Sequence, residues 1–168
     1  TTVSLRVAGQ VMMGGGLFQP ISSSIGPVLD DPADAAAHAA VLAAVGPLLA
    51  DADLSLATLG APLVSDPGTS APDPVSPGAA AAGEGSAPVT ASTATAGALA
   101  DAGIDVVSLA NGRLADAGSG GVDQTVTALD EVGVAHFGAG ATEEQAWAPA
   151  LLEVRGRTVA FVGCSDID

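Results

Sequence analysis

The stretch AGIDVVSLANGRLADAG, residues 102–118, decides the fold that this sequence predicts. It begins with a short apolar run between glycines, formed by Ile104, Val106, Val107 and Leu109. Such a run is typical of a strand that is covered on both faces of a sheet. The polar residues that follow therefore lie at the carboxyl end of a buried strand, where ligands and catalytic side chains collect in open α/β sheets. They offer one amide, one cation and one carboxylate, from Asn111, Arg113 and Asp116.

Predicted strands and helices alternate on both sides of this stretch. Apolar periodicity predicts strands over 2–7, 54–59, 104–109, 134–137 and 158–164. It predicts helices over 34–50, 93–102, 122–132 and 142–148. Alternation of this kind argues for an α/β fold with a mainly parallel sheet flanked by helices.

Three of the predicted helices carry recognisable signals near their ends. Asp31 or Asp34 is placed to cap the first helix, and Gly46–Pro47 is expected to end or kink it. Thr142, with Glu144 and Gln145 behind it, predicts an amino-terminal cap for the last helix. In the helix over 122–132, Asp123 lies near the positive end of the helix dipole.

Composition and charge exclude several classes of function. The chain has 168 residues, enough for one domain with a core, and its net charge of −15 comes from 19 acidic residues against four arginines. Nucleic acid is a poor partner for this surface, and an anionic membrane would be repelled. Apolar runs are too short and too broken for a membrane span. The lysine-free composition, rich in Ala, Gly and Thr, leads us to expect an exported protein, extracellular or at the cell surface.

Residues 65–88 differ in character from the rest of the chain. Prolines are interleaved there with Gly, Ala and Ser, so no packed element is expected. We predict a surface loop, and the alternative is a recognition segment in extended polyproline form. At the other end of the chain, the start at Thr1 without a leader fits a processed mature protein or an excised segment.

Isolated residues offer little independent chemistry. Cys164 is the single cysteine, so no disulfide can form within the chain, and its place in an apolar run predicts a buried thiol. His38 is expected on a surface or helix face, and His136 in a structural role. With two histidines and no cysteine pair, no zinc spacing can be assembled. The glycine clusters at 14–16 and 138–140 lack the frame of a dinucleotide site. Ser22–Ser24 lack a nearby base.

Four segments in the same order resemble the CapA family, the capsule or poly-γ-glutamate synthesis proteins with a metallophosphoesterase-like fold. They are VAGQVMMGGG at 7–16, DADLSLATLGAPLVS at 51–65, and residues 101–118 and 120–166. The resemblance spans nearly the whole chain. It implies a single, partial CapA-like domain over 1–168, equivalent to one half of a metallophosphoesterase-like α/β sandwich.

The family's motifs imply ligands for a metal centre, and this sequence departs from each of them. The motifs are Gly-Asp after the first strand, Asn-Leu-Glu, and Asn-Asn-His before Asp-x-Gly. The departures are Gln10 for Asp, Thr58 and Gly60 for Asn and Glu, and Gly112 and Arg113 for the second Asn and His. The residues that agree with the family are Asn111, Asp116 and Gly118.

These replacements predict a cleft without catalytic residues, metal ligands or a cofactor. Arginine stays protonated in proteins, so Arg113 cannot serve as a ligand and its charge opposes a nearby divalent ion. We expect Arg113 and Asp116 to form an ion pair where the metal would lie, or, alternatively, Arg113 to bind an anion such as carboxylate or phosphate. The candidate ligand-binding residues are Gln10, Thr58, Asn111, Arg113 and Asp116.

Further histidine motifs of the family follow the region matched here by Val162–Asp166, whereas this sequence stops at Asp168. We therefore expect a fragment, or a fold completed by a homo-oligomer or a second polypeptide. The leading hypothesis is a non-catalytic binding or structural component of a cell-surface or extracellular assembly linked to capsule or polymer synthesis. The alternative is a metallophosphoesterase-like hydrolase whose Mn, Fe or Zn site is completed by the missing half.

Overall fold

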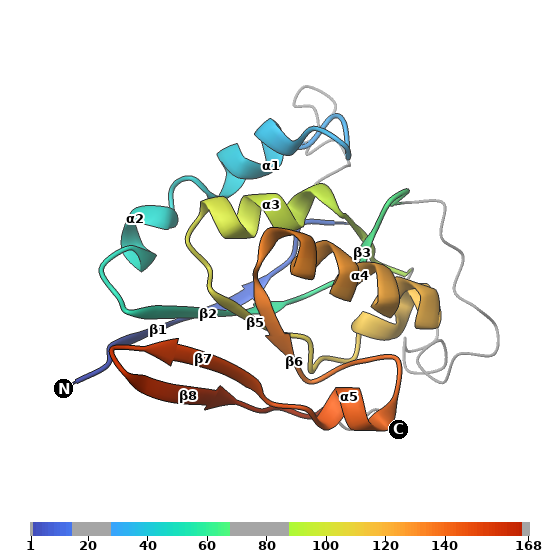
Figure 1. The fold of residues 1–168 in the computed structure, drawn as a ribbon. Coiled ribbons are helices and arrows are strands. Elements are labelled where there is room, and N and C mark those ends of the chain that lie inside the picture. Colours follow the sequence, from blue (N-terminus) through green and yellow to red (C-terminus); the bar gives the residue numbers. More distant parts are fainter. Residues whose placement is uncertain (1, 15–27, 68–87, 166–168) are drawn as a thin grey trace.

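A four-stranded parallel sheet forms the centre of the molecule (Figure 1). The computed structural model describes residues 2–14, 28–67 and 88–165. The strands of the sheet, in spatial order, are β1 (Leu5–Val11), β2 (Leu54–Leu59), β5 (Val106–Ser108) and β6 (Ala135–Phe137). All three pairings are parallel, and the two inner strands contain the fully buried Ala57, Val106 and Val107. The predicted α/β fold with a parallel sheet is confirmed.

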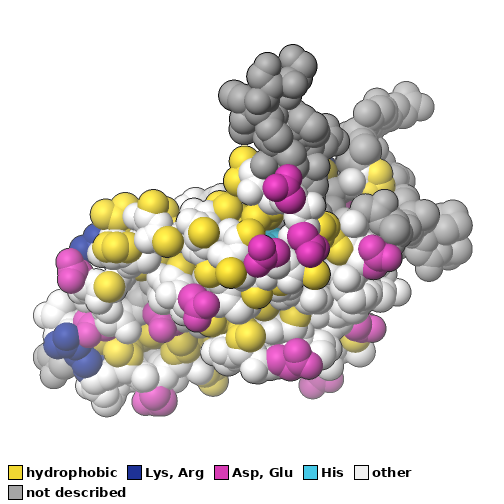
Figure 2. Space-filling model, turned by 90° about the horizontal axis from the view of Figure 1, so that it is seen from above, with side chains coloured by type: hydrophobic (Ala, Val, Ile, Leu, Met, Phe, Trp, Pro, Cys, Tyr) yellow, Lys and Arg dark blue, Asp and Glu magenta, His cyan; other side chains and the backbone are white. Residues whose placement is uncertain are grey.

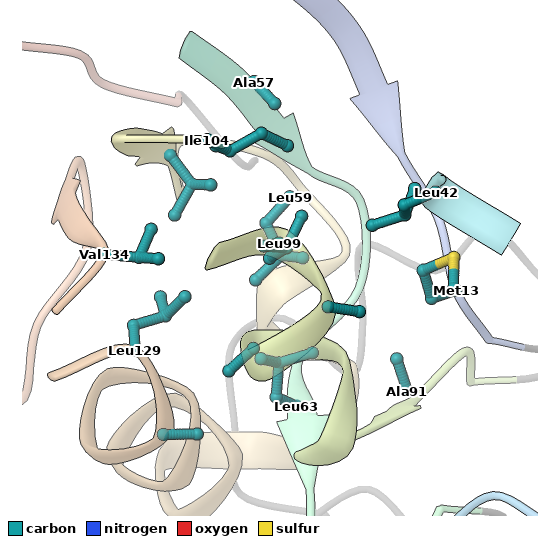
Figure 3. Packing of buried hydrophobic residues seen from close by; sticks show 14 of the residues in the cluster. Met13, Leu42, Ala57, Leu59, Leu63, Ala91, Leu99, Ile104, Leu129 and Val134 are labelled. Carbon is teal, nitrogen blue, oxygen red and sulfur yellow. The ribbon is translucent and has the colours of Figure 1, made fainter. Parts of the chain in front are cut away.

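Helices cover one face of this sheet and enclose the larger core (Figure 1). They are α1 (Ala35–Leu42), α3 (Ala94–Asp101) and α4 (Gly118–Val132). Figure 3 shows Leu59 of the sheet beside Leu99 of α3, and both side chains are almost completely buried. Burying one such side chain contributes about 1.5–3 kcal/mol. The buried side chains of α3 and α4 are therefore what hold these helices to the sheet.

A β-hairpin covers part of the opposite face (Figure 1). Its strands are β7 (Ala150–Val154) and β8 (Arg157–Phe161), which pair antiparallel. Phe161 of the hairpin stacks on Phe137 of β6 with ring centroids 6.0 Å apart. The hairpin thus encloses a second, smaller apolar cluster beneath the sheet.

The hairpin differs from the sequence prediction. The strand expected over 158–164 begins at Arg157, ends at Phe161 and does not join the parallel sheet, and β7 was not predicted. A two-residue turn joins the strands, with φ of 51° at Arg155 and 72° at Gly156. Two left-handed residues are what a tight hairpin turn needs, so Gly156 was the missed signal. Because the strand ends early, Cys164 is exposed, and the expectation of a buried thiol was wrong.

The helix predicted over 34–50 is divided into α1 and a short α2 (Gly46–Leu49). Asp34 caps α1 as expected, because its side chain accepts hydrogen bonds from the backbone N–H groups of Ala36 and Ala37. Pro47 has no backbone N–H to donate, and its ring would clash with the carbonyl group of the residue four positions earlier in a continuous helix, although it is tolerated in a first turn. The chain therefore turns after Leu42 and starts a new helix at Gly46.

Shorter elements complete the described chain. They are the parallel pair β3 (Leu63–Val64) and β4 (Ala91–Ser92), the 3-10 turn η3 (Leu114–Ala117) and α5 (Glu143–Trp147). The predicted Thr142 cap of α5 is confirmed, since its hydroxyl accepts from the Gln145 N–H. Residues 68–87 of the predicted loop lie outside the described residues, as do 15–16 of the first glycine cluster and Ser22–Ser24. Among the helices described, none is long and apolar enough to cross a membrane.

His38 is buried rather than on a surface. Its side chain lies between α1 and α3 and has no exposed area. Nε2 is 3.0 Å from the Pro32 carbonyl oxygen, and Nδ1 is 3.0 Å from Thr95 Oγ1. The surrounding alanines hide this position in the sequence, because a helix face of small residues has little hydrophobic periodicity to reveal its buried side.

Candidate functional site

The carboxyl ends of β1 and β2 bring the first candidate residues together. Gln10 and Thr58 are register partners in adjacent parallel strands. A Cβ atom built on Gly60 would lie 2.7 Å from Gln10 Nε2, so the Gln10 side chain occupies the space above Gly60. The parallel order places these positions at one edge, as strand topology requires. A larger side chain at residue 60 is excluded unless Gln10 moves.

Asn111 ties the turn after β5 to this edge. Its Nδ2 donates to the Leu59 carbonyl oxygen at 2.5 Å, and its Oδ1 accepts from the Arg113 backbone N–H at 2.9 Å. Both polar atoms of the side-chain amide therefore bind backbone groups, one in β2 and one in the turn after β5. The sequence predicted the place of Asn111, and the structure shows that it anchors the polar turn against β2.

Arg113 and Asp116 form the ion pair that their spacing predicted. Arg113 Nη1 lies 3.3 Å from Asp116 Oδ2. The Asp116 side chain is only 2% exposed, whereas that of Arg113 is 38% exposed. Oδ2 of Asp116 also accepts from the Val89 backbone N–H at 2.9 Å. A buried carboxylate needs such donors, because an unpaired one would lose its hydration without compensation.

The donor set at this edge does not fit a divalent metal ion. Gln10 and Thr58 offer neutral oxygens, Gly60 offers no side chain, and the carboxylate of Asp116 is engaged by a guanidinium. Hydrolytic metal centres need carboxylate or imidazole ligands free of such a cation. Within residues 2–14, 28–67 and 88–165, no group of three or more His, Cys, Asp or Glu side chains is arranged to hold a metal.

A small cavity of about 230 Å³ adjoins Asn111 between the carboxyl ends of β5 and β6. Gly138–Gly140 and Ser165 line part of it, and sequence reasoning did not assign them to this edge. Gly138 has φ of 88°, and an added Cβ would lie 2.7 Å from the Ala110 Cβ. The glycines after β6 therefore let the two turns approach. A glycine cluster directly after a predicted strand was the available signal.

His136 lies away from this edge, on the face of β6 that α4 covers. Its Nε2 is 3.2 Å from Asp130 Oδ1, and its side chain is 20% exposed. Nδ1 is buried and has no hydrogen-bond partner among the described residues. The expected structural contact is present, but one ring nitrogen remains unsatisfied.

Comparison with known proteins places this geometry in context. The model of the family described as "Bacterial capsule synthesis protein PGA_cap" matches residues 4–168. The match covers the central sheet, the covering helices and every candidate residue from Gln10 to Asp116. A search of curated proteins finds no match to the chain.

Proposed function

Since this chain belongs to the family of bacterial capsule synthesis proteins, we propose that it serves capsule or polymer synthesis as a binding or structural module without metal-dependent hydrolysis. The Arg113–Asp116 ion pair carries this proposal. Its guanidinium lies at the position where the family resemblance implies a histidine ligand. The pair leaves a polar edge whose charge is balanced without a metal.

The charge of Arg113 supports the proposal that no metal binds at this position. Two unit charges about 4 Å apart interact by about 4 kcal/mol at an effective dielectric constant of about 20. A divalent ion beside Arg113 would meet a repulsion of several kcal/mol, and the attraction of Asp116 would do no more than offset it. Gln10 and Thr58 cannot supply the missing charge because their oxygens are neutral.

We also propose that a second copy or another polypeptide covers part of the sheet. Leu5 and Val7 of β1 are 45% and 67% exposed. They pair in register with Leu54 and Leu56, which pack in the cluster beneath the hairpin. The apolar face therefore continues beyond the area that the hairpin covers, which favours a protein partner. The acidic, lysine-free composition supports an extracellular or cell-surface location.

Elemental analysis of the purified protein tests the absence of a metal centre. We expect manganese, iron and zinc each well below one ion per chain. Stoichiometric metal that is retained through dialysis, together with hydrolysis of a model phosphodiester, would establish the hydrolase alternative instead.

Restoring the ligand residues that the family resemblance implies tests whether their replacement is what prevents metal binding. The triple variant Gln10→Asp, Gly60→Glu and Arg113→His is compared with a double variant that keeps Arg113. The shorter aspartate side chain in place of Gln10 would vacate the space above Gly60. We expect metal binding in the triple variant and none in the double variant. Equal metal binding by both folded variants would show that Arg113 does not exclude the ion.

Light scattering, which measures the oligomeric state, tests whether a second copy covers the exposed apolar face of β1. We expect an oligomer that Val7→Glu dissociates, while Leu48→Glu, at the 62% exposed Leu48 of α2, leaves it intact. A stable, monodisperse monomer of the unmodified chain would refute self-association, and equal effects of both variants would place the interface elsewhere.

A further inference from the structure

A second cavity, of about 540 Å³, lies beside α4 at the β6 edge of the sheet. Residues of α4, β6 and the segment containing α5 line it. It exists because α5 has five residues and buries none of them, so it does not pack over β6 as the longer helices pack over the other strands. The volume is within the range of small-molecule sites, about 300–1,000 Å³.

The α4 wall carries a regular pattern of charge. Asp123, Val126, Thr127 and Asp130 line the cavity from this helix. Their spacing of i, i+3, i+4 and i+7 puts them on one helix face. At 1.5 Å rise per residue, the two aspartates are separated by about 10 Å along the helix axis. The wall thus has a carboxylate near each end and an aliphatic side chain between them.

The remaining walls complete an acidic, partly apolar surface. His136 Nε2 lies 3.2 Å from Asp130 Oδ1, and both residues line the cavity. The facing wall includes Ala139, Ala148 and Pro149, and neither lysine nor arginine is among the described lining residues. Figure 2 shows acidic side chains spread over the helix-bearing side of the molecule, with basic ones only toward one end. An anion would therefore be repelled from this cavity.

We propose that this cavity binds a linear diamine or polyamine, with one ammonium group at Asp123 and another at Asp130. The methylene chain between them lies against Val126 and the apolar wall formed by Ala148 and Pro149. Two ammonium groups at this separation satisfy both carboxylates at once, whereas a monoamine satisfies one. This inference does not depend on the proposed function, because none of the candidate residues at the edge near Arg113 lines this cavity.

Calorimetric titration of the whole chain with octamethylenediamine tests the proposal. We expect one diamine per chain, weaker binding of octylamine, and no binding of the octanedioate dianion. Asp123→Asn and Asp130→Asn should each weaken binding about three- to fivefold, as expected for losing one exposed ion pair. Glu131→Gln is the matched control, because Glu131 is on the same helix but does not line the cavity.

Three results would overturn the proposal. One is the absence of diamine binding at millimolar concentration. Another is equal binding of octylamine and the diamine, because the two carboxylates would then not act together. The last is an equal loss in Glu131→Gln, which would show attraction to the overall negative charge rather than to this cavity. Nuclear magnetic resonance gives the supporting result. We expect the His136 ring resonances to shift when diamine is added to the unmodified protein and not to shift in Asp130→Asn, which would locate the bound diamine in this cavity.

Discussion

His38 Nδ1 lies 3.0 Å from Thr95 Oγ1 in the core, and this contact joins α1 to α3. Both side chains are fully buried. Because a carbonyl oxygen can only accept, the ring nitrogen Nε2 carries the hydrogen that is donated to Pro32. In the neutral ring Nδ1 is then the acceptor, and the Thr95 hydroxyl donates to it.

Removing the Thr95 hydroxyl is expected to destabilise the fold. Thr95→Val keeps the shape but removes the buried hydrogen bond to His38 Nδ1, so we expect a loss of about 1 kcal/mol in the free energy of unfolding. Urea denaturation measures this. Thr127→Val is the control, because Thr127 is exposed and its hydroxyl donates to its own helix backbone. Equal losses in the two variants would contradict a specific role for the His38 contact.

Acid is expected to weaken the attachment of the hairpin turn through Asp53. The backbone N–H and the hydroxyl of Ser4 donate to its carboxylate, and Arg155 binds it from the hairpin. These contacts lower the pKa of Asp53 below its ordinary value. A carboxyl group whose pKa is lower in the folded state stabilises the protein above its unfolded pKa. That contribution is lost as pH falls below about 4.

Urea denaturation between neutral pH and about pH 3 checks this dependence on Asp53. Asp53→Asn should remove part of the pH dependence and lower stability at neutral pH. Asp51→Asn, at an aspartate whose side chain is 84% exposed, should leave the dependence unchanged. Identical pH profiles for Asp53→Asn and the unmodified protein would refute the prediction.

Gly60→Ala is expected to destabilise the protein through its contact with Gln10. The new Cβ would lie within 3.0 Å of three Gln10 side-chain atoms. Displacing that exposed side chain should cost about 1 kcal/mol, at the lower end of the cost of overpacking. The loss should disappear when Gln10→Ala is present as well. Persistence of the loss in the double variant would locate the strain in the backbone of residue 60.

Arg113→Ala is expected to destabilise the protein by leaving Asp116 buried without its guanidinium. The expected loss is about 1–2 kcal/mol, reduced because Arg113 is partly exposed to solvent. Asp116→Asn combined with Arg113→Ala should recover part of it, since no buried charge then remains. Thermal unfolding of Arg113→Ala, of Asp116→Asn alone and of the double variant measures the coupling. Additive losses would show that the two side chains act independently.

Local sequence signals predicted many of the elements closely. The strand over 54–59 has the bounds observed for β2, because its apolar run is compact and ends at a glycine. Asp34 and Thr142 cap their helices as predicted, since an amino-terminal cap depends on residues within one turn. The candidate edge was also predictable, because parallel strands deliver their carboxyl ends to one side of a sheet.

Long-range packing decided the features that the sequence analysis missed. The hairpin lies beneath the sheet because Ala150 and Phe161 bury apolar surface against Leu54 and Phe137, and no local pattern identifies that partner surface. The cavity beside α4 likewise depends on the small size of α5 relative to the sheet edge.

By itself, the sequence determined most of the alternating elements, the caps at Asp34 and Thr142, and the uncharged residues Gln10, Thr58 and Gly60 at the edge, because each follows from residue type and local spacing. Tertiary structure alone decided that His38 is buried and bonded to Thr95, that Gln10 occupies the space above Gly60, and that Asp116 is buried beneath Arg113. These depend on which surfaces meet across the fold. Burial and hydrogen-bond partners are properties of such contacts, so the chemistry of the site was completed only by packing.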